Sequence, residues 1–457
     1  MREADLMSSS VLRFETTAGA HIFVVDGSQI YDLPTWVDVE LRNALAIGDD
    51  AVASLLARHG VEGRCRIDDT PMSDPPLRSL SLAVTQTCNM ACGYCYAQGG
   101  SFGAPAKRME WQVARDAVLR LMASAEPGDT VNIAFLGGEP LINRALIAQT
   151  ARFAAAEGRQ KGIDVRFSIT TNGTLINSDD GDLFDEYGFA VTVSLDGIGE
   201  THDRQRPFRS GRGSYAQITA RVLPLLRKQR RMRISARVTV TPLNLGLRNT
   251  LDTLIGMGFD VVGFSPMLSS PSARLEMEDR DLDALLGELI ECGRSCESRI
   301  IAGEHYPFAN LLDALRAIHR GIHRPYPCGA GAGYLGVSAD GGLFACHRFV
   351  EDDARRLGSV ADGPDRHRQN AWLAARHVHR QEPCRSCWAR YLCGGGCHHE
   401  VIHRGRPACD LIRGWLEYCL QAYIRVSNDR PEFLAGKERP SPRRQPPQPP
   451  LPVHPLA

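Results

Sequence analysis

The chain has 457 residues, which is enough for two or three domains and at least one large hydrophobic core. Lysine plus arginine and aspartate plus glutamate both number 53, so net charge gives no reason to expect nucleic acid or a membrane as a partner. No apolar run is long enough to cross a bilayer, and residues 1–10 lack the apolar core of a signal peptide. The cytoplasm is therefore the expected compartment.

The cysteines favour metal binding or catalysis over disulfides. There are 14 of them without a secretion signal, and a reducing cytosol keeps thiols free. One group falls within residues 88–95 and another within residues 384–397. Clustering of this kind indicates metal sites.

Residues 11–66 are expected to form a small α+β domain. Three strand-like runs precede two segments with apolar residues at helical spacing: 11–14, 21–25, 29–31, 41–45 and 52–56. This order resembles the winged-helix peptide-recognition domain attached to enzymes that modify ribosomally made peptides; the alternative is an N-terminal cap on the next domain. Residues 67–79, which are rich in proline, are expected to be a linker.

Residues 80–300 alternate between strand-like and helix-like segments, which predicts an α/β fold. Six such units imply a parallel sheet curled into a partial (β/α)6 barrel, whose ligands bind where the strands end. The strand-like runs are residues 80–84, 131–136, 165–170, 190–195, 234–240 and 261–265.

A distinctive motif follows each of the first four strands. The first is the loop Cys88, Cys92 and Cys95, in which three thiolates can bind three irons of a 4Fe-4S cube and leave the fourth iron open. The other motifs are Gly-Gly-Glu-Pro, Thr-Asn-Gly and Ser-Leu-Asp-Gly, at residues 137–140, 171–173 and 194–197. Each alone is a common turn, but their order at successive strand ends predicts a site.

This arrangement resembles the radical S-adenosylmethionine (radical SAM) enzymes, from about residue 80 to residue 268. The resemblance implies that Cys88, Cys92 and Cys95 hold a 4Fe-4S cluster whose open iron chelates the methionyl group of SAM. One electron from the cluster then cleaves a C–S bond of SAM, and the resulting 5'-deoxyadenosyl radical abstracts a hydrogen atom from the substrate.

The same resemblance assigns SAM contacts to individual residues. Tyr94 matches the position that contacts the adenine, and Gly138 lies in the segment that receives the methionyl amine. Ser194 and Arg206 match positions that contact the ribose and the carboxylate. Leu268 is expected to line the adenine side.

Residues 301–434 have a different cysteine pattern, with the spacing of the SPASM extension of radical SAM enzymes. That extension carries two auxiliary iron-sulfur clusters, although paired C-x2-C units alone also suit zinc. The resemblance implies two auxiliary 4Fe-4S clusters. Their ligands would be Cys328, Cys346 and Cys397 for the first, and Cys384, Cys387, Cys393 and Cys409 for the second.

The first of these auxiliary clusters lacks one protein thiolate. Some family members have a further cysteine shortly after the position of Cys328, but residues 329–345 contain none. A substrate cysteine, water, a nearby side chain or Cys419 are the alternatives for that iron. Cys292 and Cys296, like Cys65, show no ligand pattern and are expected to be buried thiols.

The reaction is predicted from the residues beside the auxiliary cysteines. Anaerobic sulfatase maturases, which make formylglycine, have an aspartate as proton acceptor directly after the cysteine that matches Cys346, whereas this chain has His347. The surrounding runs look more like maturases that form thioether crosslinks, namely those of SCIFF peptides and, closer still, those of quinohaemoprotein amine dehydrogenase. We therefore expect thioether crosslinks within a peptide, formed by a substrate cysteine, with His347 as candidate proton acceptor. For the quinohaemoprotein group the bond would be to an Asp or Glu methylene.

The expected partners are a Cys-containing peptide or small protein subunit and a reductant such as flavodoxin or ferredoxin, with no nucleic acid or membrane. The alternatives are a formylglycine-forming sulfatase maturase and a non-catalytic iron-sulfur or zinc protein that binds peptides. Residues 435–457 are rich in proline and are expected to form a disordered tail.

Overall fold

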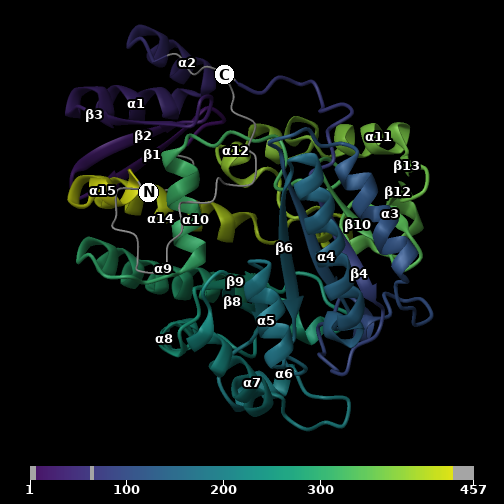
Figure 1. The fold of residues 1–457 in the computed structure, drawn as a ribbon. Coiled ribbons are helices and arrows are strands. Elements are labelled where there is room, and N and C mark those ends of the chain that lie inside the picture. The colour runs from purple at the N-terminus through teal and green to yellow at the C-terminus, as the bar shows by residue number, and fades with distance from the viewer. Residues whose placement is uncertain (1–6, 62–65, 436–457) are drawn as a thin grey trace.

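The structure, a computed structural model, describes residues 7–61 and 66–435. Figure 1 shows a small N-terminal sheet with two helices, a central α/β region and a C-terminal region of short elements and long helices. Cys65 and nearly all of the proline-rich segment lie outside the described residues. Within the described ranges, no helix is both long and apolar enough to cross a bilayer.

The N-terminal region contains a three-stranded antiparallel sheet in the order β1-β2-β3. One face of the sheet packs on the two helices through residues such as Ile22, Leu41 and Val52. The other face, which includes Phe14 and Phe23, belongs to the main core of the protein. The elements are β1 (Val11–Thr16), β2 (Gly19–Val24), β3 (Gln29–Leu33), α1 (Thr35–Ile47) and α2 (Asp49–Arg58).

The central region contains the six expected parallel strands, hydrogen-bonded in chain order. They are β4 (Ser79–Thr85), β5 (Thr130–Gly137), β6 (Asp164–Thr171), β7 (Ala190–Ser194), β8 (Arg233–Val240) and β9 (Val261–Pro266). Helices lie along one face of this sheet (Figure 1): α3 (Trp111–Met122), α4 (Arg144–Lys161), α5 (Ser178–Glu186), α7 (Tyr215–Lys228) and α8 (Leu247–Met257). The predicted α/β fold is confirmed.

Local sequence explains where these helices begin and end. The side chain of Asn177 accepts a hydrogen bond from the Asp180 amide, and the Asp180 carboxylate accepts one from the Asn177 amide, which caps the start of α5. Helices α4 and α8 end at Gly162 and Gly258, whose φ angles of 68° and 97° suit glycine.

The two faces of the sheet differ in burial. In β8, residues 234, 236, 238 and 240 are buried, whereas the alternate residues are partly or fully exposed. Strands β5, β6 and β7 show the same alternation. One face is therefore packed under the helices, and solvent reaches the opposite, inner face.

The sheet continues into the C-terminal region, which the sequence did not predict. Strand β10 (Tyr334–Val337) pairs in parallel with β4, and β11 (Gly342–Phe344), β12 (Arg356–Ser359) and β13 (Gly363–Pro364) extend the sheet in antiparallel order. These strands have two to four residues each, too few to give a periodic pattern. The ten-stranded sheet thus crosses the predicted boundary near residue 301.

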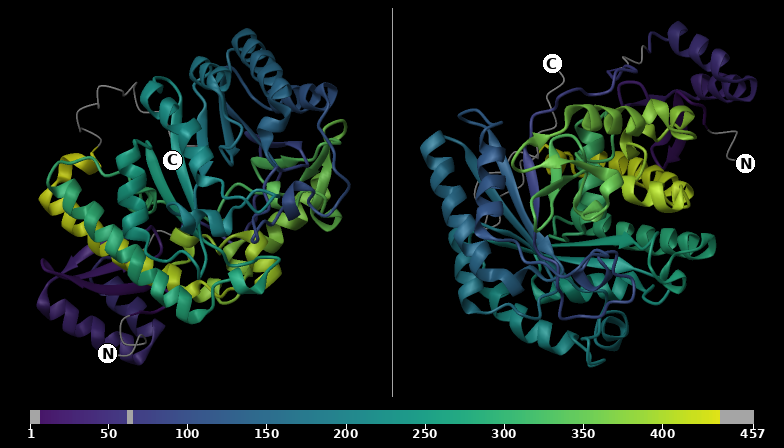
Figure 2. Two further views of the ribbon diagram at one scale, coloured as in Figure 1. Left: turned by 90° about the horizontal axis from the view of Figure 1, so that it is seen from below. Right: turned by 90° about the vertical axis from the view of Figure 1, so that its right-hand side faces the viewer.

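Long helices complete this part of the molecule. Helix α9 (Asp279–Ile301) and α10 (Ala309–His319) both pack against α14 (Cys409–Asp429). Figure 2 shows the long C-terminal helix running beside α9 in two views. The shorter helices are α6 (Glu200–Gln205), α11 (Arg366–Arg376), α12 (Arg390–Cys393), α13 (His398–Arg404) and α15 (Pro431–Leu434).

Candidate active site

The first cysteine group lies in the loop that follows β4. Cys88, Cys92 and Cys95 are all free thiols. Burial is the main cause that raises the pKa of Cys92 to about 12, and the thiols of Cys95 and Cys88 raise it as well. Buried thiols of this kind become thiolates when a metal stabilises their charge, so this donor set fits an iron-sulfur cluster.

Gly137, the last residue of β5, and Gly138 after it let this strand end approach β4 and the cysteine loop. A Cβ atom on Gly138 would lie 2.1 Å from the carbonyl oxygen of Thr87, the residue before Cys88. A Cβ atom on Gly137 would lie 2.2 Å from the carbonyl oxygen of Thr85. The close approach that these glycines permit is therefore to the end of β4 and to the backbone just before the first cysteine of the loop.

The side chain of Glu139 connects the carboxyl end of β5 with that of β6. Its fully buried carboxylate accepts hydrogen bonds from the Thr171 hydroxyl at 2.7 Å, the Asn172 amide at 2.7 Å and the Leu141 amide at 3.1 Å. The Asn172 side chain then donates to the side-chain Oδ1 of Asn89 at 2.9 Å and to the Cys88 sulfur at 3.7 Å. Glu139 thus positions the cysteine loop through Asn172, a role that the sequence analysis missed. A carboxylate directly after two glycines at a strand end was the available signal.

Replacing Glu139 by glutamine is expected to lower the free energy of unfolding by roughly 2–3 kcal/mol, because hydrogen bonds to a buried charge are worth about 1.5–3 kcal/mol each. The NH2 group of glutamine would replace one carboxylate oxygen. It would then face a hydrogen-bond donor that has an acceptor in the present structure. Urea denaturation measures the change, with the exposed Glu126→Gln as the matched control. Equal stability of the two variants would contradict this role.

Tyr94, Asp196 and Arg206 form a buried group behind the cysteine loop. The Tyr94 hydroxyl donates to the Asp196 carboxylate, and the Arg206 guanidinium donates to the Tyr94 hydroxyl. Arg206 and Asp196 also form an ion pair of 3.6 Å, and the other Asp196 oxygen accepts from the Thr239 amide at 2.9 Å. The charge of Arg206, the predicted carboxylate contact, is therefore already matched within the protein.

The other two predicted SAM contacts lie apart from each other. Ser194 ends β7 on the partly exposed inner face of the sheet. Leu268 is buried beyond β9, and its carbonyl accepts a hydrogen bond of 2.5 Å from Arg404. Leu268 also lines a pocket with the C-terminal cysteines. The structure thus places Ser194 inside the barrel and Leu268 at its junction with the C-terminal region.

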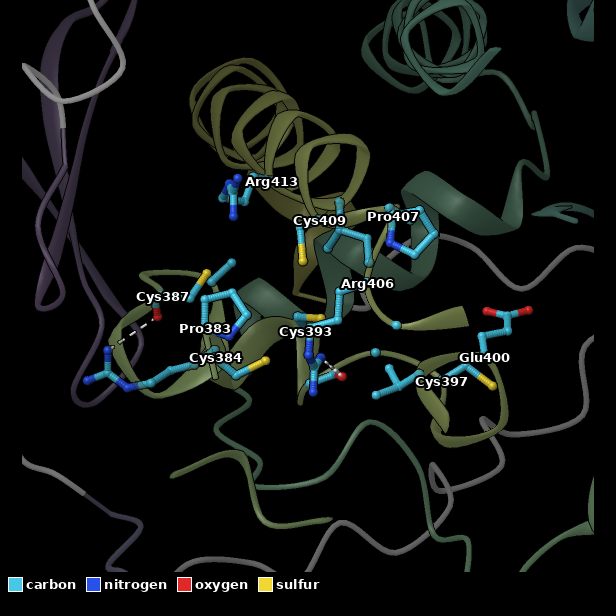
Figure 3. Close-up of a pocket in the computed structure, with 18 of the residues that line it drawn as sticks. Pro383, Cys384, Cys387, Cys393, Cys397, Glu400, Arg406, Pro407, Cys409 and Arg413 are labelled. Atoms are coloured by element: carbon cyan, nitrogen blue, oxygen red, sulfur yellow. Dashed lines mark hydrogen bonds between the residues drawn. The ribbon is translucent and has the colours of Figure 1, made fainter. Parts of the chain in front are cut away.

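The largest cysteine group lines that pocket (Figure 3). Cys384, Cys387 and Cys393 come from the loop around α12, and Cys409 is the first residue of α14. Burial raises the pKa of Cys384 to about 11, and the other three thiols of the group raise it further. The arrangement brings four thiols around one space, as a 4Fe-4S cube requires.

A smaller group contains Cys328, Cys346 and Cys397. Burial raises the pKa of Cys346 to about 12, and the thiols of Cys397 and Cys328 also act on it. Arg348 donates to the Cys397 sulfur at 3.6 Å. Cys419 is fully buried in α14, and burial alone raises its pKa. No fourth thiol among the described residues joins this group.

These groups are not arranged for a single metal ion. In the described part of the chain, no three His, Cys, Asp or Glu side chains converge on one ion. An iron-sulfur cube instead takes one thiolate on each iron, which requires thiols spread around its corners. The donor sets suit clusters better than zinc.

His347 has the environment of a structural residue. Its Nδ1 shares a hydrogen bond of 2.6 Å with the Tyr334 hydroxyl, which in turn donates to Ser81 at 2.9 Å. Burial lowers the pKa of His347 to about 4, so the ring is neutral near pH 7 and weakly basic. A neutral imidazole can accept a proton, so the role of His347 as proton acceptor stays a prediction.

An aromatic contact connects the first cysteine loop with the smaller C-terminal cysteine group. The ring of Tyr96, which follows Cys95, lies 5.9 Å from the ring of His347. The guanidinium of Arg348 lies 5.3 Å from the centre of the Tyr96 ring. Residues adjacent to ligands of both groups are thus in direct contact.

Comparison with known proteins identifies the class. Residues 82–254 match the model of the Radical SAM superfamily. Residues 82–254 therefore form a radical SAM domain with the α/β fold of that superfamily, and its cofactors are SAM and 4Fe-4S clusters. The class, fold and cofactors predicted from the sequence are confirmed.

Two sequence relatives have names that state a reaction. The serine-type anaerobic sulfatase-maturating enzyme of Klebsiella aerogenes is 26% identical over 337 residues, which cover 72% of this chain and 81% of that protein. The cysteine-type enzyme of Clostridium novyi is 25% identical over 353 residues, covering 71% and 89%. These relatives are sulfatase maturases and not the thioether-forming enzymes that the motifs suggested.

Solved structures support the fold. Histidine-tagged anSMEcpe with bound AdoMet aligns with a TM-score of 0.66 and 21% identity, covering 79% of this chain and 98% of that one. Native anSMEcpe with AdoMet and the Kp18Cys peptide aligns with a TM-score of 0.65, covering 78% and 100%. The alignment spans more than the radical SAM domain.

Proposed function

We propose that this enzyme oxidises a serine or cysteine side chain of a peptide or protein substrate to formylglycine. The observation that carries the proposal is that sulfatase-maturating relatives of both types extend over 72% and 71% of the chain. That coverage exceeds the length of the radical SAM domain. When bound, SAM and the reduced cluster supply one-electron cleavage chemistry that ends in hydrogen abstraction from the substrate.

The residues of this chain would perform three tasks in that reaction. Cys88, Cys92 and Cys95 would hold the cluster that binds SAM, in a loop that Glu139 and Asn172 keep in place. The two C-terminal cysteine groups would hold the auxiliary clusters, which would accept the second electron of this two-electron oxidation. The polar inner face of the sheet is open to solvent and would receive the substrate.

The proton acceptor is where this chain departs from sulfatase maturases. His347 stands at the position where those enzymes have an aspartate. Its pKa of about 4 makes it a weaker base than an ordinary imidazole, because burial disfavours the charged ring. Acceptance of the proton by His347 itself and acceptance by another group both fit the proposal.

A second candidate reaction is thioether crosslinking of a substrate cysteine. It is favoured by the three-thiol group of Cys328, Cys346 and Cys397, which would leave one iron without a protein thiolate. Cys328 and Cys397 are exposed, so a substrate thiol can approach them. Coordination to iron would lower the pKa of that thiol.

The N-terminal region is a candidate site for peptide binding in either case. A pocket between β3 and the two helices is lined by apolar side chains, including Ile22, Leu41 and Leu55. Within the described ranges, strand β3 pairs only with β2, so its other edge can add a peptide strand.

Mass spectrometry of a treated peptide separates the two reactions. The anaerobically reconstituted protein, SAM and a reductant would be incubated with a small Cys-containing peptide. Formylglycine formation is expected to remove sulfur and create a hydrazide-reactive aldehyde. A thioether would retain sulfur, remove two hydrogens per crosslink and block alkylation of the cysteine. Purified protein that holds zinc and releases no 5'-deoxyadenosine from SAM would contradict both.

A further inference from the structure

The inner face of strands β6 to β9 is lined mainly by polar residues. These positions are partly or fully exposed, while the alternate positions on the helix-covered face are buried, apart from Gly263, which is buried on the inner side. Partly or fully exposed polar residues on this face include Thr170, Thr192, Ser194, Ser235, Arg237, Thr239 and Ser265. Solvent, and hence a ligand, can reach this face.

Arg237 is next to Ser194, the predicted ribose contact. In the sheet, Arg237 pairs with Ser194 of β7 and with Gly263 of β9. A Cβ atom on Gly263 would lie 3.3 Å from Nη1 of Arg237, so the missing side chain gives the guanidinium room. The guanidinium donates to the hydroxyl of Ser265, a neutral partner.

The charge of Arg237 is unmatched. Among the residues that the structure describes, no carboxylate forms an ion pair with it, and surrounding protein atoms lower its pKa. Asp313 is the acidic residue that opposes this shift, but it is paired with Arg316 at 3.0 Å.

Two other arginines of the barrel have acidic partners. Arg233, on the same face of β8, pairs with Asp260 at 3.0 Å. Arg206 pairs with Asp196 at 3.6 Å. An arginine without such a partner keeps its donors available for a ligand that carries the opposite charge.

We propose that Arg237 binds a carboxylate inside the barrel, beside Ser194. The planar guanidinium presents paired N–H donors that match the two oxygens of a carboxylate. Two sources fit this chemistry: the methionyl carboxylate of SAM, and an acidic side chain of the peptide substrate. The second source rests on the proposed function, and the first does not.

Chemical protection of Arg237 tests the proposal. The full-length reconstituted protein is treated with phenylglyoxal, and modification of Arg237 and Arg233 is followed by mass spectrometry of tryptic peptides. The probes are SAM, the peptide acetyl-Gly-Cys-Gly-Glu-Gly-amide, and the same peptide with Gln in place of Glu. Arg237 is expected to react faster than Arg233, and a carboxylate probe is expected to slow only Arg237.

Each outcome has a distinct meaning. Protection by SAM alone assigns the SAM carboxylate, and protection by the Glu peptide but not the Gln peptide assigns the substrate. Neither result depends on turnover, so failure of the proposed reaction would leave them intact. Equal modification of Arg237 with and without every probe would overturn the proposal.

Substitution gives an independent measurement. Arg237→Gln is expected to weaken equilibrium binding of the protecting probe about tenfold or more, because a charge-assisted hydrogen bond is lost. Arg233→Gln, on the same strand and face, should leave that affinity within about twofold, as expected for a surface substitution outside the site. Unchanged affinity in Arg237→Gln would also overturn the proposal.

Discussion

The Cys88→Ala protein is expected to lose about a third of its iron and all measurable SAM cleavage, because two thiolates are too few to retain a 4Fe-4S cluster. Cys88 also accepts the hydrogen bonds from Met90 and Asn172 that order the loop. The two C-terminal cysteine groups are formed by other segments of the chain and should keep their iron. Iron analysis and release of 5'-deoxyadenosine under anaerobic conditions measure the two effects.

Cys292 provides the matched control. It is buried in α9 and belongs to none of the three cysteine groups. Cys292→Ala removes one buried sulfur and is expected to cost about 1 kcal/mol of stability, with full iron content and SAM cleavage. Undiminished iron and cleavage in Cys88→Ala would rule out the assigned cluster loop.

Gly138→Ala is expected to have the next largest effect, through a backbone clash instead of a lost ligand. The added Cβ would overlap the Thr87 carbonyl, at 2.1 Å, and approach the Gly100 Cα atom to 2.9 Å. Neither is a flexible side chain, so the cysteine loop must move away from β5. Overpacking of this kind typically costs about 1–3 kcal/mol, occasionally more, and the displaced loop should lose its cluster.

Gly287→Ala separates this clash from a general effect of the substitution. Gly287 lies within α9, where a Cβ atom would have no neighbour within 4 Å. Alanine there should stabilise the helix by up to about 1 kcal/mol. Denaturation and the visible absorption of the reconstituted clusters compare the two variants. A Gly138→Ala protein with normal absorption would contradict the close packing around Thr87.

Local patterns in the sequence predicted the barrel well. The apolar runs that became β4 to β9 are long enough to show strand character, and helices with matching periodicity separate them. The motifs after these strands share one edge because the strands are parallel. The cysteine loop was therefore predictable from spacing alone.

Contacts between distant segments were not predictable in this way. The short strands β10 to β13 join the sheet only because β10 pairs with β4, more than 250 positions earlier in the chain. The basicity of His347 was also not predictable from the sequence, because it depends on burial and on the contact with Tyr334. The expected thioether chemistry was inferred from residues beside the auxiliary cysteines, such as His347. The sequence relatives instead favour sulfatase maturation.

The sequence by itself determined the class of this protein, because a cysteine loop and strand-end motifs are local features that need no knowledge of long-range packing. Only the tertiary structure decided the partners of the buried charges. In the structure, the Glu139 carboxylate accepts a hydrogen bond from the Asn172 amide, and Arg206 forms an ion pair with Asp196. Arg237 has no acidic partner among the described residues. The physical reason is that charge matching in a low-dielectric interior depends on distance in space, which spacing along the chain does not specify.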